Sequence, residues 1–386
     1  MSVTHTYAAS PVEGGTLSLH GGNVGWCKLE DDKLFVVYKQ DTIHRTMGVI
    51  VTLNGNSAPT YSTPWIINST MTNTYPAFEC SRVKTADDVN GTYKVAIKYI
   101  TSNDNQQPHL SKYNHYIFIV DVAADNSMTA GTATFIHNTH PTCPMVTNNV
   151  QDRLYLSYID ASGDTWIQAR TVSGTSLSSV AWSTEIHTSA AYGGVVMRTL
   201  ENGYIMGLLW RNASEVQEEF VINSTGTLSS NLGTTYNHVG MASYEDETEA
   251  FVAYNNNIYR LRISDGARLS TIGVVTTDTS LDTVIPESNT IISLSSPTIA
   301  ASFTTAQALD ISVYKYTSDS QSVVTAEINP VSLPASIIGH TTRRSHNYWG
   351  FRNQNILHKI DVNNIAVIGV YNDSGNKFGM QIITAV

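Results

Sequence analysis

Charge is scarce in this chain. Asp, Glu, Lys and Arg make up 14% of its 386 residues, against roughly 25% in typical soluble domains. The charge that is present is mainly acidic, because 32 Asp and Glu outnumber 22 Lys and Arg and give a net charge of −10 at pH 7. Proteins that bind duplex nucleic acid need a cationic surface that displaces counterions. The composition therefore argues against nucleic acid as a partner.

Cysteine and long apolar runs are also rare. The three cysteines are Cys27, Cys80 and Cys143, and an odd number in a large domain indicates buried free thiols rather than a disulfide framework. The N-terminal segment lacks the basic start and apolar stretch of a signal peptide, and no run has the length of a transmembrane helix. We therefore expect a chain that is made in a reducing cytosol and is not inserted into a membrane.

Familiar catalytic motifs are missing as well. The chain has no G-x-S-x-G, H-E-x-x-H, P-loop or Cys-x-x-Cys sequence. The segment DASGDTW (160–166) is similar to the Asp-box of sialidase-like propellers, S-x-D-x-G-x-T-W, but Ile159 and Ala161 replace its serine and aspartate. We therefore expect no enzyme. A glycan-cleaving enzyme stays an alternative, because its two carboxylates are paired in space and not in sequence.

What the chain does contain is a repeated short apolar strand that ends in an aromatic residue. The seven copies end at Tyr38, Tyr99, Tyr158, Trp210, Tyr254, Phe303 and Tyr371. Their spacings are similar, and the stretch from the last copy through both termini to the first one matches them. A chain whose two ends complete one more period predicts a closed ring. The fold class expected is therefore all-β, a single β-propeller domain with one four-stranded blade per repeat.

The repeats set the expected blade boundaries. Seven blades would span roughly residues 14–68, 69–138, 139–188, 189–237, 238–279, 280–339, and 340–386 together with 1–13. Six or eight blades stay open, because residues 284–354 are the least regular. In the first blade we expect strands at 24–29, 34–39, 46–53 and 60–68. The last blade lacks an outer strand, so residues 4–10 are predicted to supply it and to close the ring.

Loop lengths predict two different faces of the ring. Connections between first and second strands are mostly tight, and residues 84–91 of the second blade are the exception. Connections between blades, and between second and third strands, are longer and share the opposite face. The longest are residues 100–114 and 340–353. Since binding residues concentrate on loops, we expect function on this elaborated face.

One segment of that face combines aromatic and basic residues. The candidate ligand-binding residues are Arg343, Arg344, His346, Tyr348, Trp349 and Arg352. Aromatic faces and guanidinium groups can hold a sugar ring or a protein partner. The alternative interpretation is that Trp349 and Phe351 fill the gap between the sixth and seventh blades.

Candidates for a metal site are few. His20, His140 and His238 each begin a blade, so their imidazoles would converge on the rim of the central channel, where packing is the alternative role. Asp160 and Asp164 could contribute to a Ca²⁺ loop, although carboxylates in a hairpin usually form turns. We expect no cofactor, and a structural Ca²⁺ stays open.

The first repeats resemble those of one group of proteins. KLEDDKLFVVYKQ and TYSTPWIIN are similar to repeats in bacteriophage tail-fibre, tail-tip and spike proteins. The resemblance implies a non-enzymatic protein that is made in the host cytoplasm and assembled into the virion. We therefore expect a structural or adhesion component whose partners are other virion subunits or a host-surface glycan. The alternative is a free lectin, which predicts equivalent sugar pockets in several blades.

Overall fold

Antiparallel sheets dominate the computed structural model. It describes residues 2–8, 24–40, 45–54, 57–69, 77–101, 113–139, 144–148, 150–160, 162–187, 195–199, 204–210, 217–231, 239–242, 249–254, 257–262, 268–273, 290–295, 298–304, 308–315, 331–334, 357–361, 363–372 and 376–384. Within these ranges the one helix is a short 3-10 helix, Ala86–Asn90. None of the described helices is long and apolar enough to cross a membrane.

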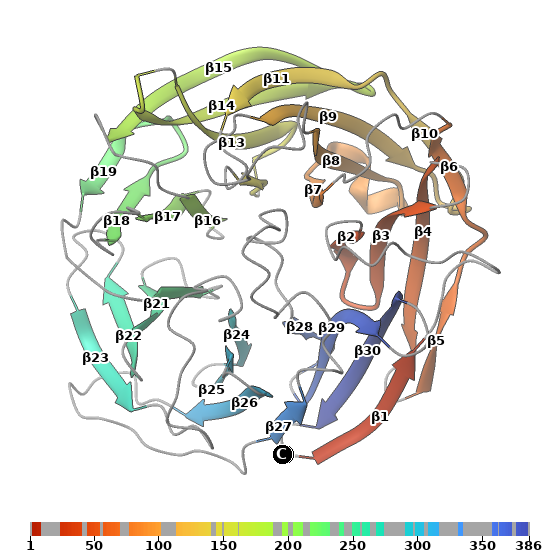
Figure 1. Ribbon diagram of the computed structural model, residues 1–386, viewed down its shortest axis with the longest axis vertical. Coiled ribbons are helices and arrows are strands. Elements are labelled where there is room, and N and C mark those ends of the chain that lie inside the picture. Colours follow the sequence, from red (N-terminus) through yellow and green to blue (C-terminus); the bar gives the residue numbers. More distant parts are fainter. Residues whose placement is uncertain are drawn as a thin grey trace.

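The sheets stand around a common centre, as Figure 1 shows, with β2, β7, β16 and β28 among the strands nearest to it. The first sheet contains β2 (Val24–Glu30), β3 (Lys33–Gln40), β4 (Arg45–Asn54), β5 (Ser57–Tyr61) and β6 (Trp65–Asn68). The second contains β7 (Ala77–Val83), β8 (Tyr93–Thr101), β9 (Tyr113–Val122), β10 (Met128–Ala130) and β11 (Thr134–Thr139). In both sheets each strand pairs antiparallel with the next, moving outwards, up to the third strand.

The next two sheets have four strands each. One contains β12 (Met145–Val146), β13 (Arg153–Ile159), β14 (Thr165–Ser173) and β15 (Ser176–His187). The other contains β16 (Val195–Thr199), β17 (Ile205–Trp210), β18 (Gln217–Ile222) and β19 (Leu228–Asn231). In each sheet the spatial order of the strands follows their order in the chain.

An eight-stranded sheet follows. Its strands are β20 (Val239–Ala242), β21 (Glu249–Tyr254), β22 (Asn257–Arg262), β23 (Arg268–Gly273), β24 (Thr290–Ser295), β25 (Thr298–Thr304), β26 (Ala308–Lys315) and β27 (Val331–Pro334). It consists of two four-stranded meanders. Among the described residues, the strand pairing that joins them is the parallel one between β20 and β24, with Met241 opposite Thr290 and Ala242 opposite Ile291.

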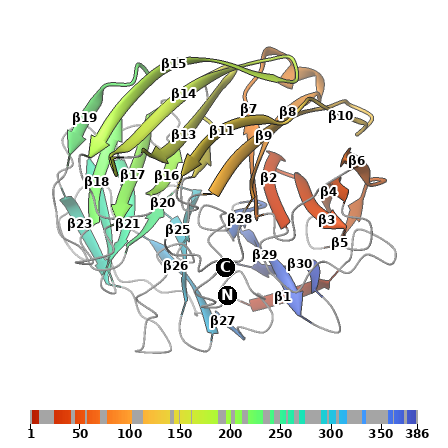
Figure 2. The same ribbon diagram turned by 45° about the horizontal axis from the view of Figure 1, so that its top comes forward.

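The last sheet brings the two ends of the chain together. It contains β28 (Leu357–Lys359), β29 (Asn364–Asn372), β30 (Asn376–Thr384) and β1 (Ser2–Ala8). β1 pairs antiparallel with β30, from Ser2 opposite Thr384 to Ala8 opposite Gly379, and Figure 2 shows the two strands side by side. This pairing covers an edge of β30 that would otherwise be open to other chains.

The core lies between neighbouring sheets. Along β3, Phe35 and Val37 pack against the second sheet. Leu34, Val36 and Tyr38 point the other way, into a cluster that includes Ala366 of the last sheet. Successive side chains of a strand point to opposite faces, so a strand covered on both faces must be apolar throughout. The repeated apolar strand that ends at Tyr38 is therefore covered on both faces, and the first and last sheets are in contact.

The outer edge of the first sheet differs from the prediction. Residues 60–68 were expected to form one strand, but β5 ends at Tyr61 and β6 begins at Trp65. The Ser62 hydroxyl accepts a hydrogen bond from Ile50 N at 2.9 Å. Pro64 follows, and proline has no N–H group to donate to a neighbouring strand. The serine side chain and the proline therefore interrupt the pairing.

The contact between the second and third sheets contains a buried ion pair. Lys98 Nζ lies 2.6 Å from Glu79 Oε2, and both side chains are almost completely buried. The same carboxylate oxygen accepts a hydrogen bond from Met145 N of β12 at 3.2 Å. Glu79 therefore links the inner strands of two sheets. Two of the cysteines lie on inner strands, with Cys27 buried and Cys80 partly buried as free thiols. Cys143 lies outside the described residues.

Candidate functional site

The connection between β7 and β8 forms the start of a polar groove. It contains the 3-10 helix, whose last turn ends at Gly91 with a left-handed φ of 71°. The helix is held from inside by Asp88, which accepts hydrogen bonds from the Thr85 hydroxyl at 2.9 Å and from Arg82 Nη2 at 2.8 Å. The Asp88 side chain is almost buried. This connection is therefore a fixed structure and not a simple turn.

Contacts with β2 of the first sheet also hold the β7–β8 connection in place. The Arg82 guanidinium lies over the Tyr93 ring, 5.1 Å from its centroid, and Arg82 Nη1 donates to Leu29 O. The Tyr93 hydroxyl donates to Glu30 Oε1. That hydrogen bond lowers the pKa of Glu30, while burial and the same hydrogen bond raise the pKa of Tyr93 to about 12. The pair therefore keeps one charged and one neutral partner at neutral pH.

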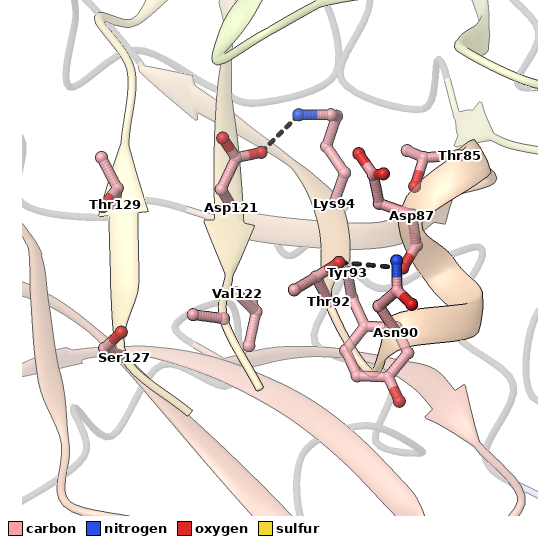
Figure 3. Close-up of a pocket in the computed structure, with 11 residues that line it drawn as sticks. Thr85, Asp87, Asn90, Thr92, Tyr93, Lys94, Asp121, Val122, Ser127 and Thr129 are labelled. Carbon is pink, nitrogen blue, oxygen red and sulfur yellow. Dashed lines mark hydrogen bonds and ion pairs between the residues drawn. The ribbon is translucent and has the colours of Figure 1, made fainter. Parts of the chain in front are cut away.

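The groove itself has a volume of about 440 Å³. One side is formed by the helical connection and the start of β8, and the other by the end of β9, its turn and β10 (Figure 3). Its lining residues are Thr85, Asp87, Asn90, Thr92, Tyr93, Lys94, Asp121, Val122, Ala123, Ser127 and Thr129. Most of these residues carry hydroxyl, amide or charged groups, so the groove is suited to a polar ligand.

The charges in the groove are partly compensated. Lys94 and Asp121 lie opposite each other on β8 and β9 and form an ion pair. Lys94 Nζ also donates to Gly174 O, in the turn between β14 and β15, at 2.8 Å. Asp87 has no ion-pair partner among the described residues. The groove therefore carries an excess of negative charge.

The turn between β9 and β10 fixes the other side of the groove. Ala123 N donates to Ser127 O at 2.9 Å, and Asn126 N donates to Ala123 O at 2.8 Å. Ser127 N donates to Asp125 Oδ1 at 2.9 Å. Asn126 has a left-handed φ of 65°, which asparagine tolerates better than most residues. Both sides of the groove are thus held by their own hydrogen bonds.

Comparison with known proteins gives matches at the level of structure. No protein-family model and no curated protein sequence matches the chain. The structure is similar to the WD40 domain of SCAP from fission yeast, with 8% identity, a TM-score of 0.51 and 98% of each chain covered. It is also similar to a prolyl endopeptidase, with 9% identity, a TM-score of 0.51, and 96% of this chain and 51% of that chain covered. The chain thus spans about half the length of that endopeptidase.

WD40 repeats form β-propellers, in which four-stranded sheets surround a central channel. The sheets of this chain surround a common centre in the same way (Figure 1). The fold is a β-propeller. A third similar structure is the β-propeller domain of the Trilobed protease from Pyrococcus furiosus, with 8% identity, a TM-score of 0.46, and coverage of 95% of this chain and 97% of that one. The all-β propeller expected from the repeats is confirmed, and at such low identity the likeness concerns the fold alone.

Most of the site residues expected from the sequence fall outside the described part of the propeller. This holds for the candidate ligand-binding residues Arg343, Arg344, His346, Tyr348, Trp349 and Arg352. It also holds for the metal candidates His20, His140 and His238. Among the described residues, no three His, Cys, Asp or Glu side chains are grouped closely enough to hold a metal ion.

Asp160 and Asp164 lie in the turn between β13 and β14. Asp160 Oδ1 accepts hydrogen bonds from Ser162 N at 2.8 Å and Asp164 N at 3.0 Å, and Oδ2 accepts one from Trp166 Nε1 at 3.1 Å. Slight burial raises the pKa of Asp160, but these hydrogen bonds outweigh it and lower the pKa. The structure thus gives Asp160 a role in forming the turn, and Ca²⁺ binding there stays a prediction.

The groove lies on the face of the propeller that was expected to be flat. It is built from a connection between first and second strands and from one between third and fourth strands, which share that face. The signal in the sequence was the unusual length of residues 84–91. The role of the β9–β10 turn had no comparable signal, because it is the β8–β9 pairing that brings residues 121–129 beside residues 85–94.

Proposed function

We propose that this chain is a structural or adhesion component of a virus particle, made in the host cytoplasm, and that it contacts a host-surface glycan or a neighbouring virion subunit without catalysis. The propeller in this proposal has seven four-stranded blades. The two meanders of the eight-stranded sheet are separate blades that touch through β20 and β24. β1 is the outer strand of the last blade and closes the ring.

The observation that carries the proposal is the exposure of apolar side chains at the outer circumference of the first three blades. Their outermost strands expose large apolar side chains, namely Trp65 (41%), Ile66 (49%), Phe135 (51%) and Val180 (45%). Single exposed apolar residues are common on soluble proteins. Of the five large apolar side chains that the described residues expose, these four lie on the outer strands of successive blades, and the fifth is Val89 of the 3-10 helix. An exposed apolar edge favours association unless another surface covers it. A neighbouring subunit in a particle would provide that cover.

The test combines cell binding with self-association. Purified, fluorescently labelled protein is titrated onto intact cells of a panel of bacterial strains, with Trp349→Ala alongside, and the unlabelled protein is studied by analytical ultracentrifugation. We expect saturable binding to one of the strains, or self-association that Trp65→Ser weakens. Loss of cell binding in Trp349→Ala would assign binding to residues 340–353. A folded protein that binds no strain and stays monomeric contradicts the proposal.

A free lectin is the second candidate, and the polar groove favours it. A lectin predicts equivalent sugar sites in several blades. However, β3 of the first blade follows β2 after a two-residue turn, whereas a 3-10 helix separates β7 from β8. The first blade therefore lacks the helical side of the groove. Ligand titration separates the two functions, because a lectin of this type binds several sugars per chain.

A further inference from the structure

We infer that the groove between the 3-10 helix of the second blade and the β9–β10 turn binds a neutral carbohydrate, with the Asp87 carboxylate and the hydroxyl groups of the opposite side as its main contacts. The inference rests on the proposed function in one respect, since a host-surface glycan is one of the ligands proposed there. It adds the class of sugar and a location, on the face opposite to the one where the sequence predicts binding.

The size and polarity of the groove argue for a small hydrophilic ligand. Its volume of about 440 Å³ falls in the range of roughly 300–1,000 Å³ that is usual for ligand pockets. Most such pockets are largely apolar, whereas polar and apolar atoms contribute about equally to this lining. Tyr93 as a whole is only 5% exposed, and its hydroxyl donates a hydrogen bond to Glu30. An apolar ligand would therefore leave the polar lining groups without partners.

The charges favour a neutral ligand over an anion. The Lys94 ammonium is compensated by Asp121, and Asp88 beside the groove is compensated by Arg82. Asp87 then contributes an excess negative charge, which repels a sialic acid or a phosphate. Sugar hydroxyls can instead donate to this carboxylate, and hydrogen bonds to a charged acceptor are the stronger ones.

The lining offers both hydrogen-bond donors and acceptors, which the hydroxyl groups of a sugar require. In Figure 3, Asp87 and Asn90 lie on one side of the groove, Ser127 and Thr129 lie on the other, and the Lys94–Asp121 pair lies between them. Each sugar hydroxyl both donates and accepts hydrogen bonds, and the lining offers a carboxylate acceptor together with amide and hydroxyl donors. A Ca²⁺ ion needs six to eight oxygen ligands, and Asp121 is already paired with Lys94. The lining therefore suits a polyol better than a metal ion.

Hydrogen bonds hold both sides of the groove in place without a ligand. The helical side is fixed by the Asp88 hydrogen bonds, and Thr92 Oγ1 donates to Asp87 O at 2.9 Å. The opposite side is fixed by the turn hydrogen bonds of Ala123 and Ser127. A preformed site loses less conformational entropy on binding, which matters for a weakly binding sugar.

The test uses matched probes and matched variants of the full chain. The probes are lactose, maltotriose and mannotriose as neutral sugars and 3′-sialyllactose as the acidic partner of lactose, each followed by saturation-transfer NMR and titration. The variants are Asp87→Asn and Thr129→Val in the groove. Asp32→Asn is the control, because Asp32 lies in the exposed β2–β3 turn, outside the groove lining.

We expect at least one neutral sugar to bind, Asp87→Asn to weaken it about tenfold or more, as loss of a hydrogen bond to a charged group predicts, and Asp32→Asn to leave it unchanged. Tighter binding of 3′-sialyllactose, equal affinity of Asp87→Asn, or no binding of any neutral probe at millimolar concentration would overturn the inference. Cell binding that survives in Asp87→Asn leaves the adhesion proposal standing without this site. If the groove binds a sugar but the protein binds no cells, the groove inference stands and attachment to host cells does not.

Discussion

Acid should destabilise this propeller through His358. The side chain lies on β28 and is 5% exposed, with its ring edge-on to Trp26 at a centroid distance of 6.4 Å. Its Nε2 is 3.1 Å from Asp31 O in the β2–β3 turn. His358 therefore lies where the last blade meets the first. Burial lowers its pKa from 6.5 to about 4, although the hydrogen bond to Asp31 acts in the opposite direction.

The sign of the effect follows from where the proton binds. Between pH 6.5 and about pH 4, the unfolded chain protonates His358 while the folded chain keeps it neutral, so the free energy of unfolding falls as the pH falls. The loss begins near the unfolded pKa and is complete below the folded one. At about 1.4 kcal/mol for each unit of pKa difference, the full loss is about 3 kcal/mol. Asp31, whose pKa is lowered by its hydrogen bond with Lys28, loses its contribution at still lower pH.

The assay compares urea unfolding of the wild type and His358→Gln across this pH range. Glutamine cannot titrate, and its amide can still donate to Asp31 O. We expect the wild type to lose about 3 kcal/mol more than the variant between pH 7 and pH 4. His137, whose pKa burial also lowers, is present in both proteins and cancels from the difference. Parallel curves for the two proteins would refute the reasoning.

Three further perturbations test the contacts between and within blades. Deletion of residues 1–12 removes β1 and exposes the edge of β30, so we expect a lower melting temperature, and an unchanged one would contradict the closing role of this strand. Gly25→Ala would bring a Cβ within 2.9 Å of Phe78 Cβ, and we expect urea denaturation to show a loss of roughly 1–3 kcal/mol. Lys98→Met removes the cation from the buried pair with Glu79; a loss of about 3–5 kcal/mol is expected, partly recovered by adding Glu79→Gln.

The sequence predicts those parts of the fold that depend on strand periodicity. In β3, Phe35 and Leu34 pack on opposite neighbours, which is why an uninterrupted apolar run marks a strand between two sheets. Local side-chain effects were harder to foresee. The break between β5 and β6 depends on the Ser62 hydroxyl replacing a backbone partner of Ile50, and the period of the repeat carries no information about that.

In the sequence, the groove is indicated by the length of one connection between strands and not by the residue types that line it. Residues 84–91 stand out because the corresponding turn after β2 needs only two residues. Asp88, Arg82 and Tyr93 hold the insertion against the first blade. A rigid, polar and solvent-facing insertion in one repeat breaks the equivalence of the blades. This difference between the first and second blades is the reason to seek ligand recognition at the second blade first.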